Sequence, residues 1–290
     1  MVTSYITPDY QVKYYRKGFY KVIRFDTPRL PRLPGDRKGD VTADKLSQAL
    51  SRAKSVIQQV AICNDWDWFF TCTLDAAKWD RHDIDVFRCK FPQWIRDYNK
   101  KHHLQIKYLI VPELHKDGAV HIHGFIKGLP EYFVSRFVPF VHPRKLVEGD
   151  YYNWVDCSNK FGYCSLAPVR DPIAVGFYVT KYITKELVRD FVGYGSHLYY
   201  CSIGLNRAVP LGYVYGRSVS LDRYLDCKHE FCSTGYADEK IWDYLWHCYG
   251  PDEWLPDDLY VSCSEIEPEI ITNLEFEQLC MYLNDSGGMV

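Results

Sequence analysis

Alternating and helical hydrophobic patterns divide much of the chain into predicted strands and helices. Apolar residues recur every three or four positions over 42–61, which predicts a helix. The run 68–74 is aromatic and β-branched, which predicts a buried strand. A second apolar stripe predicts a helix over 83–99. We expect a kink or a break at Pro92, because proline has no amide hydrogen for a helix interior.

Two strands joined by a tight turn follow that helix. Residues 106–113 and 119–127 are both predicted strands, and the Asp117-Gly118 dipeptide between them favours a hairpin. The pattern then predicts a short helix over 130–137, strands within 151–168, a helix from Asp171 to about Val188 and a strand over 198–203.

This order of elements predicts an α+β fold in which helices pack on an antiparallel sheet. No G-K-[ST] sequence is present, so we expect no nucleotide cofactor. No apolar run approaches the length of a membrane span, and no secretory leader is recognisable. The 11 cysteines are scattered without a C-x-x-C pair. These features predict a cytoplasmic protein with reduced thiols and no membrane partner.

Charge is distributed unevenly along the 290 residues. Residues 250–290 hold ten acidic and no basic side chains, which leaves 35 basic against 27 acidic residues, a net charge of +8, in the remainder. A basic body rich in tyrosine suits a polyanionic partner. We predict four segments: a basic, tyrosine-rich arm and linker over 1–40, a main domain over 41–225, a Cys/His-containing extension over 226–249 and an acidic tail over 250–290.

The sequence G-A-V-H-I-H-G carries the first candidate chemistry. His121 and His123 alternate on a predicted strand, so both imidazoles point to one face while Ile122 points to the other. A turn at 115–118 folds Glu113 back beside them. Two imidazoles and one carboxylate form a typical open site for a divalent metal ion. A half-buried histidine pair without metal is the alternative interpretation.

The second candidate motif is a tandem Y-x-x-K on the predicted helix after Asp171. Tyr178 and Tyr182 lie one helical turn apart, and so do Lys181 and Lys185. A phenol with its ordinary pKa of about 10 is a poor nucleophile at neutral pH. Nearby ammonium groups and a metal-polarised electrophile would offset this weakness. Alone, the pattern is more typical of an ordinary helix surface, where Tyr and Lys are common.

Together, the two motifs and the segment before them resemble the HUH endonucleases, most closely the rolling-circle replication initiators of small single-stranded DNA phages (the gene A type). The matching segments are F-F-T-C-T-L-D over 69–75, Glu113 with H-I-H over 121–123, and G-F-Y-V-T-K-Y-I-T-K over 176–185. They occur in the family's order within residues 65–190. The resemblance implies a ferredoxin-like or RRM-like antiparallel sheet, with the histidines on a central strand and the tyrosines on a facing helix.

The resemblance also implies an activity, which is nicking of single-stranded origin DNA by tyrosine transesterification. The products are a 5′-phosphotyrosine and a free 3′-OH, and rejoining follows after a round of rolling-circle replication. We expect Mg²⁺ or Mn²⁺ as cofactor and a host helicase and DNA polymerase as partners. The residues expected in the site are the metal ligands His121, His123 and Glu113, the catalytic residues Tyr178, Tyr182, Lys181 and Lys185, and the DNA-binding residues Thr71, Thr73, Lys13, Arg16 and Lys17.

Two alternatives remain at this stage. A transposase or a plasmid relaxase would use the same fold, although the paired tyrosines favour a replication protein. A single-stranded-DNA-binding regulatory protein without catalytic activity belongs to another class. It would bind DNA in a salt-dependent manner and show no metal-dependent cleavage.

Overall fold

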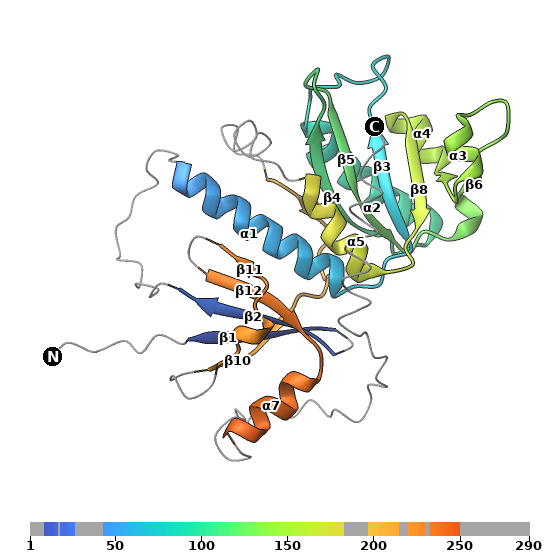
Figure 1. The fold of residues 1–290 in the computed structure, drawn as a ribbon. Helices are drawn as coiled ribbons and strands as arrows, with labels where there is room; N and C mark the ends of the chain where they lie inside the picture. The colour runs from blue at the N-terminus through green and yellow to red at the C-terminus, as the bar shows by residue number, and fades with distance from the viewer. Residues whose placement is uncertain are drawn as a thin grey trace. The chain divides into compact units, whose positions relative to one another are not determined.

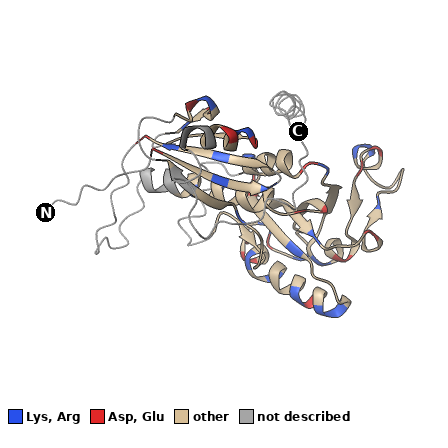
Figure 2. Ribbon diagram, turned by 90° about the horizontal axis from the view of Figure 1, so that it is seen from below, with Lys and Arg blue, Asp and Glu red and all other residues tan. Residues whose placement is uncertain are grey.

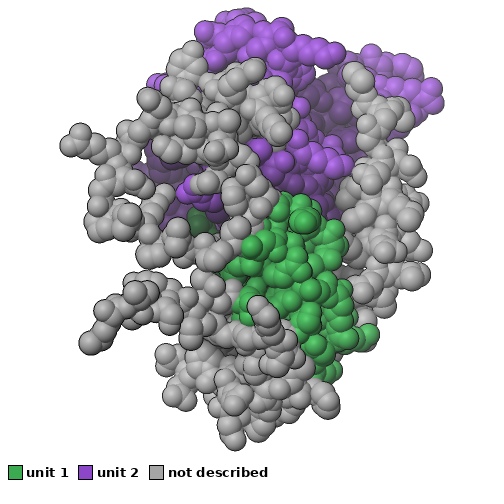
Figure 3. Space-filling model, turned by 60° about the vertical axis from the view of Figure 1, so that its left-hand side comes forward, with its two compact units in different colours: residues 1–40, 207–290 green, residues 41–206 purple. Residues whose placement is uncertain are grey.

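A computed structural model describes residues 9–16, 18–26, 43–182, 197–214, 220–229 and 232–249. The chain divides into two compact units, one formed by 41–206 and the other by 1–40 together with 207–290 (Figure 3). This division differs from the predicted segments, because the two ends of the chain contribute to one unit. The acidic segment 250–290 lies outside the described residues.

The smaller unit contains a five-stranded antiparallel sheet with strand order β10-β1-β2-β12-β11. Apolar side chains at alternate positions, such as Val12 and Val22, pack with Ile241 and Leu245 of a helix, α7. The elements are β1 (Tyr10–Arg16), β2 (Phe19–Phe25), β10 (Val209–Val214), β11 (Cys227–Lys228), β12 (Cys232–Ala237) and α7 (Lys240–Tyr249).

The predicted arm and the predicted extension therefore meet as strands of one sheet. Strands β1 and β2 pair with each other, and they also pair with β10 on one side and β12 on the other. Their partners lie about 200 positions away in the sequence, where the hydrophobic pattern shows no clear period. The local pattern along the arm could not identify these distant partners.

The larger unit contains a seven-stranded antiparallel sheet with strand order β6-β7-β8-β3-β5-β4-β9 (Figure 1). The α+β class with an antiparallel sheet is thus confirmed, and it fits the HUH endonuclease fold. The strands are β3 (Trp68–Thr73), β4 (Lys107–Leu114), β5 (Val120–Lys127), β6 (Ser135–Arg136), β7 (Tyr152–Asn153), β8 (Cys164–Pro168) and β9 (Tyr200–Cys201).

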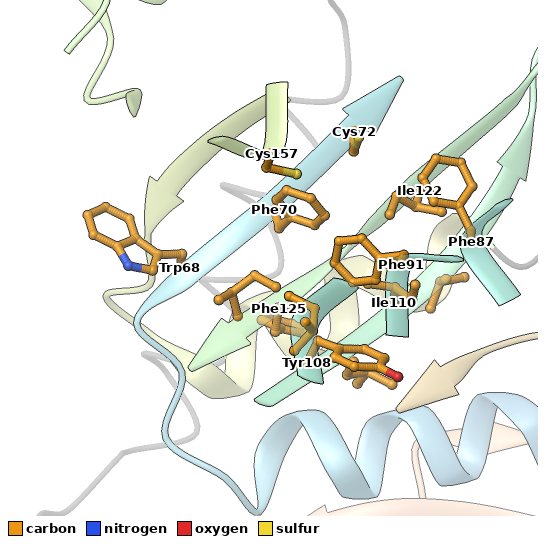
Figure 4. Packing of buried hydrophobic residues seen from close by; sticks show 14 of the residues in the cluster. Trp68, Phe70, Cys72, Phe87, Phe91, Tyr108, Ile110, Ile122, Phe125 and Cys157 are labelled. Carbon is orange, nitrogen blue, oxygen red and sulfur yellow. The ribbon is translucent and has the colours of Figure 1, made fainter. Parts of the chain in front are cut away.

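Helices cover both faces of this sheet (Figure 1). Phe70 of β3 and Ile122 of β5 lie on the face that packs against α2, where Phe91 is fully buried (Figure 4). The opposite face carries the histidines and meets α1 and α5. The helices are α1 (Ala43–Ile62), α2 (Phe91–His102), α3 (Arg144–Glu148), α4 (Val155–Phe161) and α5 (Pro172–Val179).

The break expected at Pro92 is present. A π-helical turn over Val86–Lys90 precedes α2, which begins at Phe91, so Pro92 lies in the first helical turn. A missing amide hydrogen costs little there, because the first amides of a helix have no partner within it. The predicted helix over 83–99 is therefore two helical segments with different hydrogen-bonding patterns.

Two predicted elements are wrong. Residues 155–161 lie within the segment 151–168, predicted to form strands joined by a turn at 159–162, but they form α4, where buried Cys157 and Phe161 pack next to α2. The predicted helix over 130–137 is a short 3₁₀ turn, Glu131–Phe133, followed by β6. At α4, the burial of Cys157 and Phe161 overrides a weak local preference, whereas the turn at 131–133 buries none of its residues.

No helix among the described residues is long and apolar enough to cross a membrane. Lys and Arg are spread over helices and strands instead of being concentrated on one element (Figure 2). The charge pattern of the described residues therefore does not by itself identify a nucleic-acid-binding face.

Candidate active site

The register of three neighbouring strands places the candidate residues of the sheet on one face. His121 and His123 of β5 lie directly opposite Thr73 and Thr71 of β3, and Glu113 of β4 lies opposite His121. Paired residues in antiparallel strands point to the same face. The hairpin turn expected before β5 is present, because Gly118 adopts a φ of 80° and its amide donates to the carbonyl of His115.

His123 is held at both ring nitrogens. Its Nε2 atom lies 2.7 Å from Oε2 of Glu113, and its Nδ1 atom lies 3.2 Å from Oγ1 of Thr71. A carboxylate can only accept, so Nε2–H donates to Glu113 and Nδ1 of a neutral ring accepts from Thr71. This hydrogen bond lowers the pKa of Glu113, which favours the ionised carboxylate.

His121 is held at one ring nitrogen only. Its Nδ1 atom lies 2.8 Å from Oγ1 of Thr73, whereas its buried Nε2 atom has no hydrogen-bond partner. The exposed ring of His115 stacks on it with 3.5 Å between ring centres. Burial, together with His115 and His123, lowers the pKa of His121 to about 4. The imidazole is therefore neutral at physiological pH, with an unused ring nitrogen.

The two tyrosines face the histidines from the end of α5. Asp171 caps this helix by accepting from the amides of Ile173 and Ala174. Tyr178 lies in its last turn, and Tyr182 lies in the 3₁₀ turn Thr180–Tyr182 (η3) that continues it. Despite this tightening, the hydroxyl of Tyr182 donates to that of Tyr178 at 2.8 Å.

Ring stacking connects the tyrosine pair to the sheet. The Tyr182 ring lies parallel to that of His123, with 3.8 Å between the centres, and Phe69 of β3 contacts the Tyr178 ring edge-to-face at 5.7 Å. Burial and the hydrogen bond to Tyr178 raise the pKa of Tyr182, so it remains a protonated donor. The ammonium of Lys181 lies 5.3 Å from the centre of the Tyr178 ring.

The donor chemistry of the pair of histidines suits a metal ion. In each imidazole, Nδ1 bonds a threonine hydroxyl, and such support by a second hydrogen bond is typical of metal-binding histidines. However, no three His, Cys, Asp or Glu side chains within the described parts of the chain are grouped so that they could hold a metal ion. Glu113 and His123 bond each other instead.

Several of the predicted site residues lie close together here, with contacts that the motifs do not specify. Thr71 and Thr73 were expected to bind DNA, and their hydroxyls contact the histidines. Strand alternation together with the register of β3 would have indicated this. Phe69, part of the first motif, was given no role of its own. Lys13 and Arg16 lie on β1 in the other unit, and Lys17 and Lys185 lie outside the described residues.

The low pKa of His121 predicts a pH dependence of stability. An unfolded histidine titrates near 6.5, so between pH 6.5 and about 4 the unfolded chain binds more protons at this position. The contribution of the neutral His121 ring to the free energy of unfolding is complete above pH 6.5 and is lost as the pH falls toward 4. Urea unfolding in EDTA should therefore show a steeper loss of stability with acid for the wild type than for His121→Gln. Equal slopes would contradict the prediction.

Comparison with known proteins agrees with this geometry. Residues 67–187 match a family model described as replication-associated protein ORF2, a segment that includes β3, β4, β5 and α5. No curated protein and no solved structure matches the chain. The matched segment contains both histidines, Glu113 and both tyrosines, and the resemblance to replication initiators is confirmed at the level of the family. Residues 67–187 thus resemble the ORF2 family of replication-associated proteins.

Proposed function

We propose that the protein initiates replication by nicking single-stranded DNA through a tyrosine nucleophile. One observation carries the proposal: two tyrosine hydroxyls 2.8 Å apart face a histidine–carboxylate pair on the neighbouring sheet. The family match adds that the domain is replication-associated. Neither a packing role nor simple DNA binding requires two phenols to share a hydrogen bond beside imidazoles.

In the proposed reaction, a tyrosine Oη gives up its proton and attacks a DNA phosphorus atom. The new bond joins the 5′ side of the strand to the tyrosine, the bond from phosphorus to the 3′ oxygen breaks, and that oxygen takes up a proton. The energy of the phosphodiester is retained in the phosphotyrosine, so attack by a 3′-OH reverses the step without a nucleotide cofactor. A second tyrosine within hydrogen-bond distance allows another transfer before the first adduct is released.

A divalent cation, Mg²⁺ or Mn²⁺, is part of the proposal. His121, through its unpartnered Nε2 atom, and His123 and Glu113 would hold it. When bound, such an ion polarises a phosphate oxygen as a Lewis acid. Binding through Nε2 of His123 requires the hydrogen bond to Glu113 to open and the ring proton to move to Nδ1, where Thr71 can accept it.

The deciding experiment looks for a covalent adduct. The protein is incubated with 5′- or 3′-labelled single-stranded DNA of randomised sequence and Mg²⁺ or Mn²⁺, and the products are separated in SDS. We expect a protein band carrying DNA downstream of the nick, which has lost its 5′ label, and a released fragment with a free 3′-OH. Mass spectrometry should place the adduct on Tyr178 or Tyr182. Salt-dependent binding without any adduct would instead favour a non-catalytic single-stranded-DNA-binding protein.

The remaining expectations follow from this function. A nickase without a nucleotide-binding loop needs another protein to separate the strands, so a host helicase and a DNA polymerase belong to the proposal. A transposase or relaxase would use the same chemistry. Rejoining of the nicked strand into a circle, tested with a circular single-stranded substrate, separates rolling-circle replication from transfer into an unrelated target.

A further inference from the structure

A pocket of about 510 Å³ opens beside the candidate site, within the unit formed by 41–206. The chain that leaves β3, from Thr73 to Asp75, lines one side, and Phe137 and His142 line another. Thr73 also holds the ring of His121. One lining residue, Thr73, thus also positions a residue of the candidate site. Neither Tyr178 nor Tyr182 lines the pocket, and none of the metal-ligand candidates does.

The lining combines hydrogen-bonding groups with a positive charge. The lining includes Asn153 and Asn159 with side-chain amides, Ser158 and Tyr163 with hydroxyls, and Arg81 with a guanidinium. Within it, the Ser158 hydroxyl donates to Oδ1 of Asn153. Amides and hydroxyls both donate and accept hydrogen bonds. This mixture matches the edge of a nucleobase, which also presents donors and acceptors in one plane. A volume of this size is ordinary for a ligand site, for which about 300–1,000 Å³ is typical.

The pocket is also electrostatically suited to a polyanion. Its carboxylate, Asp75, is compensated, because Lys78 lies 3.3 Å from one oxygen and the Ala77 amide donates to the other at 2.9 Å. Arg81 meets Asp117 at 3.8 Å, which is beyond hydrogen-bond distance. The guanidinium can therefore turn toward a phosphate at little cost.

One aromatic ring of the pocket lining, and a second ring in the turn between two lining residues, are exposed to solvent. Tyr163 is 46% exposed, and the turn between Phe137 and His142 presents Phe140 with a fully exposed ring. Phe140 also has a φ of 66°, in the left-handed region that a bulky residue avoids. The turn is closed by the amide of Val138, which donates to Nδ1 of His142 at 3.0 Å. Strain of this kind persists where the surrounding structure fixes the residue, and it is common at ligand sites.

We propose that this pocket receives one unpaired nucleobase of the DNA strand next to the scissile phosphate. Tyr163 and Phe140 supply the stacking surfaces, the amides read the edge of the base, and Arg81 contacts the adjoining phosphate. The inference rests on the proposed function and deepens it, because a base held beside the nicking site would determine where the strand is cut.

The first test measures binding in EDTA, so that no cleavage intervenes. Fluorescein-labelled 20-mers of randomised single-stranded DNA are compared with 20-mers of abasic deoxyribose phosphate. Tyr163→Ala and Phe140→Gly should each weaken binding of the base-bearing strand by roughly 5- to 150-fold, the effect of losing one stacked base. Binding of the abasic strand should change little. Tyr132→Ala is the matched control, because Tyr132 is 79% exposed and lies neither in the pocket lining nor in the turn between Phe137 and His142.

Phe140→Gly also separates a binding role from a structural one. Glycine adopts the positive φ without strain, so this variant should melt at the same or a higher temperature while it binds DNA more weakly. Equal affinity of both variants and the wild type for the base-bearing strand would overturn the proposal. A mononucleotide mixture that competes as well as the oligonucleotide would also overturn it, in favour of a free-nucleotide site.

The second test uses cleavage and distinguishes the two proposals. Sequencing of fragments cut from the randomised library should show a base preference near the nick, and Asn153→Ala or Asn159→Ala should relax it at one position. Cleavage with the same preferences in both variants would contradict the pocket and leave the nicking function intact. Base-dependent binding without any adduct would support the pocket and contradict the nicking function.

Discussion

Replacement of both tyrosines, Tyr178→Phe with Tyr182→Phe, is expected to abolish the covalent adduct. The two single replacements should reduce adduct formation by different amounts. Tyr182 donates its hydroxyl proton to Tyr178 at 2.8 Å and stacks on His123. In this arrangement the Tyr178 oxygen accepts a hydrogen bond that stabilises a developing phenolate. Tyr178→Phe should therefore remove most of the first adduct, and Tyr182→Phe should slow it roughly 2- to 10-fold, the net effect of one hydrogen bond.

Single-turnover adduct formation on labelled single-stranded DNA measures this difference. Tyr132→Phe provides a control, since this exposed tyrosine lies outside the candidate site. Melting curves of each variant should match the wild type, because phenylalanine keeps the ring contacts. An adduct at the wild-type rate in the double variant would show that another residue is the nucleophile. If the two single variants lost equal amounts of adduct, the hydrogen bond would not determine which tyrosine attacks first.

Gly124→Ala is expected to disturb both the sheet and the candidate site. A Cβ atom at Gly124 would lie 1.9 Å from the carbonyl oxygen of Leu109 and 2.8 Å from Cα of Ile110, both backbone atoms of β4. Neither can move without changing the pairing of β4 with β5. Overpacking of this kind costs roughly 1–3 kcal/mol, and the melting temperature should fall by roughly 2–12 °C.

The same change should reduce adduct formation, because Gly124 follows His123 directly and Glu113 lies on the strand that must move. Lys127→Ala in the same strand is the matched control and should leave both melting and adduct formation close to wild type. Thermal unfolding followed by circular dichroism, together with the adduct assay, tests the prediction. A Gly124→Ala protein that melts and reacts like the wild type would show that the strands accommodate a methyl group here.

Much of the larger unit could be predicted from local patterns. Strands β3, β4 and β5 and helix α1 each satisfy a hydrophobic period, and Asp171-Pro172 is a recognisable helix start. Alternation also explains why His121 and His123 share a face. These features depend on neighbours in sequence, which is the information that a single chain displays most directly.

The remaining features depend on long-range contacts. The hydrogen bonds between Thr71 and His123 and between Thr73 and His121 follow from the register of β3 against β5, about 50 positions apart. The pairing of Glu113 with His123 depends on side-chain conformation, which no motif specifies. The sheet of the smaller unit joins residues from both ends of the chain, and α4 is fixed by burial next to α2. Periodicity gives no information on any of these contacts.

The alternation along β3 and β5 limits how such a domain can diverge. Thr71 and His123 face the tyrosines, while Phe70 and Ile122 on the same strands fill the interior. Deletion of one residue in β5 would exchange its two sets of side chains, placing the imidazoles among aromatic rings in the interior and aliphatic side chains beside the phenols. Deletion in β3 would exchange its threonines with its interior aromatic residues in the same way. Insertions and deletions in relatives should therefore accumulate in connections such as 128–151, while the central strands keep a constant length.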